Sequence, residues 1–182
     1  METLIFERTN EVRKNKRELE KKLYVAITID GKKVAIDGEP IAEFTAEQVL
    51  SAINFGFSSK RALFILNTDI QFKKLNIKNF THRKNLREIK ARLIGTEGKT
   101  KKTIEEVADC DIVINEKDNE VGIIGPASSM DNATTAITNL IRGSKQGNVY
   151  KYLENMNREK KKYLGDLGLK IKEDKKISYN KL

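Results

Sequence analysis

The chain has 182 residues, enough for one large or two small domains, and 38% of them are hydrophobic, enough for modest cores. No apolar run reaches the roughly 18 residues of a membrane span, and the N-terminal METLIFERTNEVRKNK lacks the ordered regions of a signal peptide. One cysteine, Cys110, and one histidine, His82, exclude an internal disulfide and leave too few ligands for a zinc site. These features predict a cytoplasmic protein without a bound metal or cofactor.

The net charge of +9 is unevenly distributed along the chain. Residues 71–102 contain eleven Lys or Arg and only two acids, Glu88 and Glu97, so this segment alone carries +9. Residues 142–182 carry +7, from twelve Lys or Arg and five acids. A lysine-rich surface without a ligand is one explanation, but the clustering favours a polyanionic partner.

Hydrophobic periodicity and turn residues predict five elements in the first part of the chain. They are a charged helix, two strands of a hairpin that turns at Asp30-Gly31, a helix after the Gly38-Glu39-Pro40 break, and a short helix capped by Ser58 or Ser59. Their expected ranges are 10–23, 24–30, 33–36, 45–55 and 58–66.

The second part repeats this order with one more helix and a Gly-rich loop. The expected elements are a strand, a basic helix, the loop, a helix, two strands and two helices, over 70–80, 81–94, 95–98, 100–108, 111–115, 120–124, 130–142 and 148–163. SAINFGFSSKRALFIL (51–66) also matches NLIRGSKQGNVYKYL (139–153) at an offset of about 87 residues. The sequence therefore predicts two tandem modules, 1–68 and 69–164, and a basic flexible tail, 165–182.

The most informative stretch is ARLIGTEGKTKKTIEE, residues 91–106. Two glycines three positions apart, followed by Lys-Thr, match the end of a Walker A loop or the GxxG loop of an RNA-binding domain. A Walker A loop needs a glycine at position 93, which is Leu93, and a strand in front of it. Residues 86–94 instead show helical spacing of their apolar side chains, which favours the GxxG loop over a nucleotide-dependent enzyme.

The β-α-α-β-β-α order with GxxG between the first two helices resembles the type I KH fold. More narrowly, IGTEGKTKKTIEE, EVGIIG and IRGSKQGNVYKYLE resemble the Pno/Krr-related KH proteins that assemble the small ribosomal subunit, in particular their archaeal members, over roughly residues 10–165. Lys101, where ordinary KH domains carry an aliphatic residue that here comes at Ile104, is a feature of this narrower family. The predicted class is therefore α+β, with two tandem type I KH domains, the first degenerate and with 10–13 in place of GxxG.

Single-stranded RNA is bound with its backbone close to the protein, which requires residues without Cβ and favours a helix N-terminus with cations nearby. Four isoleucines could form an apolar floor beneath about four nucleotides, and core packing is an equal alternative for each of them. Glu97 departs from the usual basic loop and would cost about 1 kcal/mol against a phosphate. The predicted RNA-binding residues are Arg92, Ile94, Gly95, Thr96, Glu97, Gly98, Lys99, Thr100, Lys101, Lys102, Ile104, Ile112 and Ile114.

No carboxylate pair, Ser–His pair or metal cluster is apparent, so the predicted function is non-catalytic. The resemblance implies binding at the 3′ end of small-subunit ribosomal RNA (rRNA) during ribosome assembly and rRNA processing. It also implies a Nob-type endonuclease and the alpha subunit of initiation factor two as partners. The alternative is a protein-interaction scaffold without RNA readout. For the first module, packing or a protein contact is favoured over RNA binding.

Overall fold

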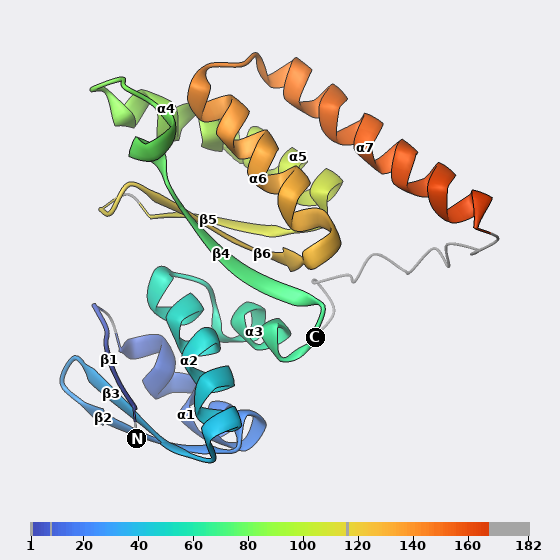
Figure 1. Ribbon diagram of the computed structural model, residues 1–182. Coiled ribbons are helices and arrows are strands. Elements are labelled where there is room, and N and C mark those ends of the chain that lie inside the picture. Colours follow the sequence, from blue (N-terminus) through green and yellow to red (C-terminus); the bar gives the residue numbers. More distant parts are fainter. Residues whose placement is uncertain (1, 8, 116, 168–182) are drawn as a thin grey trace.

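The first module is a three-stranded sheet with helices on one side. The computed structural model describes residues 2–7, 9–115 and 117–167 (Figure 1). The sheet has the antiparallel order β1-β3-β2. The elements of this module are β1 (Glu2–Ile5), α1 (Asn10–Leu23), β2 (Val25–Asp30), β3 (Lys33–Gly38), α2 (Pro40–Phe55) and α3 (Ser59–Ala62), followed by a 3₁₀ turn (Leu63–Leu66).

The second module has the same sheet topology, β4-β6-β5, and one additional helix before the equivalent of α1. Its order, β-α-α-β-β-α, is the predicted one, and the α+β class is confirmed. The first module has only one helix between its first two strands. The elements of the second module are β4 (Ile70–Asn76), α4 (Leu86–Ile94), α5 (Lys99–Ala108), β5 (Asp111–Asn115), β6 (Glu120–Pro126), α6 (Ala127–Arg142) and α7 (Gln146–Asp166), with 3₁₀ turns at Ile77–Phe80 and Thr96–Gly98.

The strand expected over 70–80 is shorter than predicted and ends at Asn76. The Asn76 side chain accepts a hydrogen bond of 3.0 Å from the backbone N–H of Lys78, which folds the next residues into a 3₁₀ turn. Asparagine promotes such turns because its side chain competes with the sheet for backbone donors.

The helix expected over 81–94 begins late, at Leu86. Asn85 is its N-cap, and the Asn85 side chain accepts from the N–H of Glu88 at 3.4 Å. The five residues before Leu86 form an irregular segment in which the Thr81 hydroxyl accepts from the N–H of Arg83. The apolar spacing in this region therefore predicted the helix, and the Asn-x-x-Glu capping pattern fixes where it starts.

Two other helices begin earlier than their apolar stripes indicated. α2 begins at Pro40 rather than residue 45, and α6 begins at Ala127, directly after Pro126, rather than at residue 130. Pro40 suits the first position of α2 because its fixed φ is helical and the first helical N–H has no partner in any case, whereas Pro126 is the N-cap of α6. Each proline was expected only to end the preceding strand.

The last helix, α7, is longer than the predicted 148–163 and runs from Gln146 to Asp166. It overlaps the beginning of the segment expected to be a flexible tail. Residues 168–182 of that predicted tail lie outside the described residues.

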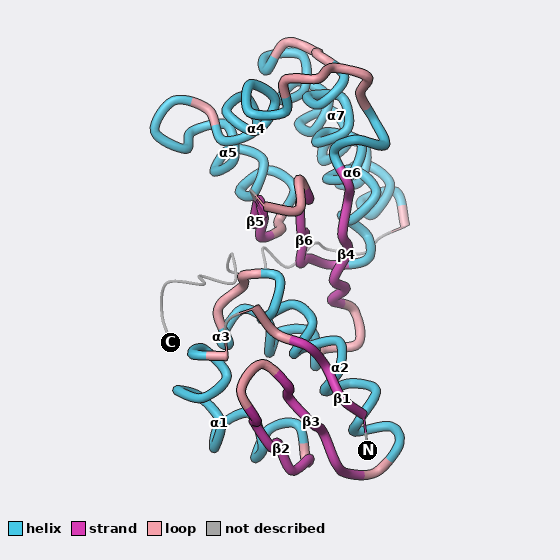
Figure 2. Tube along the Cα trace, turned by 90° about the vertical axis from the view of Figure 1, so that its left-hand side faces the viewer, coloured by secondary structure: helices cyan, strands magenta, loops and turns pink. Residues whose placement is uncertain are grey.

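Both faces of the second sheet are covered. Its inner face packs under α4, α5 and α6, while its outer face packs on the end of α2 and on α3, as Figures 1 and 2 show. Strand β6, EVGIIGP, is accordingly buried at five consecutive positions, which is typical of a strand covered on both sides. On the outer face, Ile124 belongs to the core of the first module, and the partly buried Phe72 and Val113 pack against that core.

An aromatic cluster joins the two modules. The rings of Phe55, Phe57 and Phe72 have centroids 5.7–6.2 Å apart. Gly122 makes room for this cluster, since a Cβ at that position would lie 2.5 Å from the Phe55 ring. Beside the cluster, Arg61 of the first module pairs with Asp111 of β5 at 3.0 Å.

Candidate nucleic-acid interface

The GxxG loop is a tight turn between two helices. α4 ends at Ile94, Gly95 has φ +75° and ψ 174°, and α5 begins at Lys99. Between them, Glu97 and Gly98 also have positive φ, +52° and +74°. Three left-handed residues within four positions reverse the chain so that the loop and the N-terminus of α5 point outward together.

The two glycines of the loop have different roles. A Cβ on Gly95 would lie 2.2 Å from the Oγ1 atom of Thr100, so this glycine is required by packing inside the loop. A Cβ on Gly98 would meet no atom within 4 Å. Gly98 therefore provides the open surface on which a sugar–phosphate backbone can approach the chain.

Thr100 positions the loop and is itself 2% exposed. Its Oγ1 atom accepts a hydrogen bond of 2.7 Å from Nε2 of Gln146, the first residue of α7, and the same Nε2 lies 3.4 Å from the carbonyl of Arg92. Gln146 thus ties α7 to both helices that flank the GxxG loop. Sequence reasoning missed it, because nothing in its spacing marks it as a neighbour of residues 46 positions away.

The three lysines of α5 have different surroundings. Lys99 and Lys102 are exposed, whereas Lys101 is half-buried and pairs with Glu105 at 3.4 Å. The contact of 3.8 Å between Lys99 and Glu97 joins two exposed side chains and holds neither of them firmly. Thr96 and Glu97 are exposed at the tip of the loop. Lys99 and Lys102 are therefore the α5 cations that are free to meet a phosphate.

The side chain of Arg92 lies between the GxxG loop and the turn that joins α6 to α7. Its Nη2 atom donates to the carbonyl oxygen of Ser144 at 2.8 Å, and its Nη1 atom is 3.8 Å from the Cβ position of Gly143. Arg92 therefore faces the turn between α6 and α7. It connects the loop to that turn and does not point along α5.

The four isoleucines divide into two pairs. Ile104 and Ile112 are 1% and 4% exposed and belong to the core of the second module, which is the packing alternative. Ile94 and Ile114 are half-buried, one at the end of α4 and one on β5. Only this second pair offers side-chain surface to a base.

β5 is an edge strand, so one side of its backbone is unpaired within the sheet. The N–H of Ile112 points outward and donates to Oε1 of Glu105 on α5 at 2.8 Å. Residues of an antiparallel strand alternate between the two sides, so the peptide groups of Ile114 face the same open edge. α5, the helix that begins at the GxxG loop, therefore contacts this edge through Glu105.

Other candidate chemistry is weak. His82 is exposed, and burial raises the pKa of the Cys110 thiol, which is 4% exposed and therefore poorly reactive. Among the residues that the structure describes, no three His, Cys, Asp or Glu side chains are grouped as a metal site would require. Within the same residues, none of the helices has the length and apolar character needed to span a bilayer.

Comparison with known proteins supports an RNA-binding fold. Residues 71–158 match the family model for the second KH domain of Pno1, described as a eukaryotic type KH domain, type I. A KH domain-containing protein of Methanocaldococcus jannaschii is 30% identical over 76% of this chain and 63% of its own length. The RNA-binding protein pno1 of Dictyostelium discoideum is 33% identical over 62% of this chain and 47% of its own length. The chain thus spans about half to three fifths of these curated relatives.

Solved structures extend the similarity to both modules. Dim2p of Pyrococcus horikoshii is 32% identical, with a TM-score of 0.77 over 85% of this chain and 98% of that one. The same archaeal protein in a complex with a/eIF2α and rRNA is 30% identical, with a TM-score of 0.76 over 87% of this chain and 94% of that one.

Proposed function

The chain belongs to the Pno1/Dim2-like family of KH-domain proteins, and on that premise we propose that it binds single-stranded RNA through its second module. The observation that carries the proposal is the environment of Gly98. This residue has no Cβ, has open space in front of it, and precedes a ten-residue helix whose first turn carries the exposed Lys99 and Lys102. Such a site suits a phosphate backbone.

We infer that the GxxG loop and the open edge of β5 form the two sides of an RNA-binding groove and contribute different contacts. Gly98, Lys99 and Lys102 hold phosphates at the positive end of α5. Ile94 and Ile114 contact bases, and the outward peptide groups of Ile114 hydrogen-bond to base edges. A KH groove of this kind accommodates about four nucleotides.

We further propose that the RNA is the 3′ end of small-subunit rRNA during ribosome assembly, that the role is non-catalytic and that the protein acts in the cytoplasm. The archaeal relative solved with a/eIF2α and rRNA supports both an rRNA ligand and the alpha subunit of initiation factor two as a partner. A Nob-type endonuclease is the partner expected for processing of that end.

The direct test is a pair of matched glycine variants, Gly98→Asp and Gly31→Asp. Both glycines have positive φ, +74° and +55°, and neither would place a Cβ within 4 Å of another atom. The two substitutions therefore impose similar backbone strain and the same change of charge. Gly98→Asp should weaken binding of a pyrimidine-rich single strand by at least about tenfold in fluorescence anisotropy, since it places an anion where a phosphate would lie.

Gly31→Asp should leave the affinity within about twofold, because it changes only the hairpin turn of the first module and, through net charge, distant electrostatics. Equal affinity of Gly98→Asp and Gly31→Asp would contradict the proposal. Gly95→Asp is unsuitable for this test, because the clash with Thr100 would disturb folding as well as binding.

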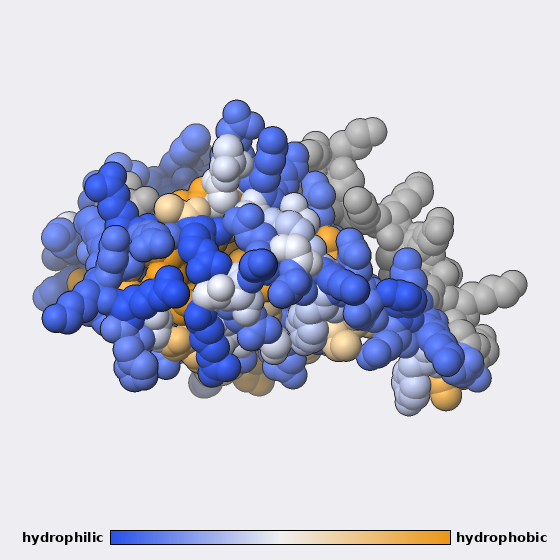
Figure 3. Space-filling model, turned by 90° about the horizontal axis from the view of Figure 1, so that it is seen from above, coloured by the Kyte–Doolittle hydropathy of each residue, from blue (hydrophilic) through white to orange (hydrophobic). Residues whose placement is uncertain are grey.

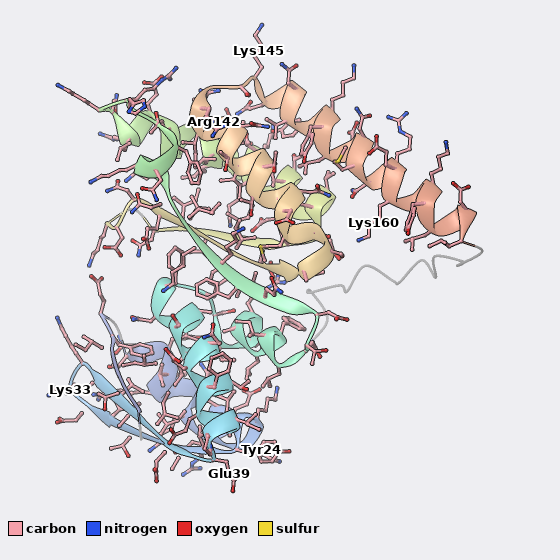
Figure 4. The ribbon with its side chains drawn as sticks, viewed as in Figure 1. Tyr24, Lys33, Glu39, Arg142, Lys145 and Lys160 are labelled. Carbon is pink, nitrogen blue, oxygen red and sulfur yellow. The ribbon has the colours of Figure 1, made fainter. Side chains whose placement is uncertain are left out.

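A protein contact on the first module is a second candidate function with an observation of its own. Tyr24, Ile41 and Phe44 are 84%, 84% and 64% exposed. Tyr24 directly precedes β2, whose first residue pairs with Gly38, and α2, which carries Ile41 and Phe44, begins two residues after Gly38. Figure 4 accordingly shows Tyr24 near Glu39, the residue before α2. Exposed apolar side chains gathered in this way are typical of a protein-binding surface.

A further inference from the structure

We propose that four cations around the turn between α6 and α7 bind phosphates of RNA nucleotides that lie outside the KH groove. This turn cluster consists of Arg83, Arg92, Arg142 and Lys145. The inference rests on the proposed function and lengthens the RNA segment that the second module holds.

The turn cluster gathers side chains from three parts of the chain. Gly143 lies at its centre, with the Cβ position of that glycine 3.4 Å from Nη2 of Arg83 and 3.8 Å from Nη1 of Arg92. Arg142 and Lys145 flank the same glycine in sequence, and Figure 4 shows Arg142 at the end of α6 beside α4 and Lys145 pointing away from the body of the molecule. Arg83, Arg142 and Lys145 are all exposed.

The turn cluster adjoins the GxxG loop directly. Gln146, the residue after Lys145, hydrogen-bonds to Thr100, and Thr100 packs against Gly95. The Gln146 side chain therefore bridges the turn and the GxxG loop. Figure 3 looks down on the end of the molecule where the turn lies, and hydrophilic residues cover most of that surface.

Among the residues that the structure describes, no acidic side chain pairs with the turn cluster. Within 2–7, 9–115 and 117–167, the side chains of Arg83, Arg142 and Lys145 form no ion pair or hydrogen bond, and Arg92 binds only a carbonyl oxygen. Like charges brought together without a counter-charge destabilise one another. A phosphate chain would remove that repulsion and release its own counterions.

The cations of the turn cluster are not needed to cap α6, because α2 in the first module has the same cap without them. The backbone N–H of Gly143 and of Ser144 donate to the carbonyls of Asn139 and Leu140, which completes a Schellman-type cap on α6. α2 ends in the same way at Gly56, where the N–H of Gly56 and of Phe57 donate to the carbonyls of Ala52 and Ile53.

The residues around the two caps differ because one cap faces the other module and the other cap faces solvent. At the offset of 87 residues, Phe55 and Ser58 occupy the places of Arg142 and Lys145. The cap of the first module presents aromatic side chains to the second module, and it needs no cations to form. The cap of the second module presents cations to solvent beside the GxxG loop. The cations are therefore free to serve a ligand.

The test compares two RNAs and two triple variants. The RNAs are a pyrimidine-rich tetranucleotide, followed by NMR titration, and a single strand of about twelve nucleotides that contains it, followed by anisotropy. The first variant is Arg83→Gln, Arg142→Gln and Lys145→Gln. The control is Arg13→Gln, Arg17→Gln and Lys33→Gln, which removes the same charge from exposed side chains of the first module. Circular dichroism checks that both variants are folded.

The turn-cluster variant should bind the tetranucleotide within about twofold of the unmodified chain and the longer RNA about tenfold more weakly at low salt. The slope of log affinity against log salt for the longer RNA should fall by about 2, since each lost phosphate contact on a single strand contributes about 0.7. The control variant should retain that slope.

Three results would overturn the inference. They are an unchanged affinity of the turn-cluster variant for the longer RNA, an equal loss in the control variant, or an equal loss for the two RNAs, which would place the cations inside the groove. Failure of the proposed function is a separate outcome, since Gly98→Asp would then leave both RNAs bound as tightly as before.

Discussion

The two modules share one arrangement of a helix, two hairpin strands and a following helix, which is their common frame, and only the second module carries the GxxG loop of the proposed RNA site. In the first module the N–H of Ile27 donates to Glu20 at 2.9 Å, and in the second the N–H of Ile112 donates to Glu105 at 2.8 Å. Each glutamate also pairs with a lysine one turn earlier. These pairs are 85 residues apart in sequence, so α1 corresponds to α5 and β2 to β5.

Backbone geometry repeats at the same interval. Tyr24 and Asp109 end their helices with φ of +56° and +49°. The glycines of the following hairpins, Gly38 and Gly125, each pack against the residue after that cap, Val25 or Cys110. Beyond the hairpins the interval grows from 85 to 87 residues, because the second hairpin has the longer turn.

The features that the two modules share maintain the fold, whereas the features found only in the second module are candidates for function. The first module has no counterpart of α4, and its residues 10–13, at the GxxG position, form the first turn of α1 instead. The glutamate contact to the edge strand persists there without the loop. That contact therefore belongs to the frame, whereas α4, the loop and the exposed cations belong to the proposed RNA site.

The largest expected effect distinguishes the two loop glycines. Gly95→Ala should lower the free energy of unfolding by about 2–5 kcal/mol, because the φ and ψ of Gly95 are nearly exclusive to glycine and the added methyl meets Thr100. Gly98→Ala should cost only about 1 kcal/mol, for a left-handed residue in open space. Urea denaturation measures both values, and similar costs would show that the loop is not built as described.

A smaller effect is expected where the modules meet. Burial raises the pKa of Asp111, and the guanidinium of Arg61 opposes that rise. Arg61→Met should therefore raise the pKa of Asp111 further and destabilise the protein by about 1–2 kcal/mol at about pH 7, between the values for exposed and buried pairs.

The loss of stability in Arg61→Met should depend on pH in a defined direction. A carboxyl whose pKa is raised by folding costs stability when it is ionised, so the deficit of Arg61→Met should shrink as the pH falls toward about 4 and Asp111 takes up a proton. Thermal unfolding at a series of pH values measures this. A deficit that grows toward acid pH would contradict the assignment.

The smallest expected effect tests the shared frame. Glu20→Ala and Glu105→Ala should each cost about 1 kcal/mol, since each removes one hydrogen bond from a strand edge. RNA affinity should not fall in Glu105→Ala, because that contact has a counterpart in the module without a GxxG loop. Loss of RNA binding at unchanged stability would instead assign Glu105 to the site.

Sequence patterns predicted the frame well where the local signal was strong. The helix over 10–23 and the strand over 111–115 match the structure to the residue, because each combines a clear apolar period with a defined end. Boundaries set by a single side chain were missed, as at Pro40 and at the Asn85 cap. A stripe of apolar residues indicates which face is buried, whereas caps determine where an element begins.

The sequence was less informative about the surroundings of the candidate site, for a related reason. The loop and its lysines are contiguous, so the sequence displayed them together. The contacts of Gln146 with Thr100 and of Arg92 with Ser144 span 46 and 52 residues, and no local pattern reveals them. For Ile104 and Ile112, periodicity could not distinguish a groove floor from the core beneath it.

The aromatic contact between the modules has a mechanical consequence. Phe55 and Phe57 lie against Gly122 in the middle of the second sheet. Neither module can therefore swing about the short connection between the 3₁₀ turn Leu63–Leu66 and β4 without exposing that sheet. In solution, both halves should therefore tumble with one rotational correlation time. A partner protein bound to the first module would therefore keep a constant distance and angle to an RNA strand bound to the second module.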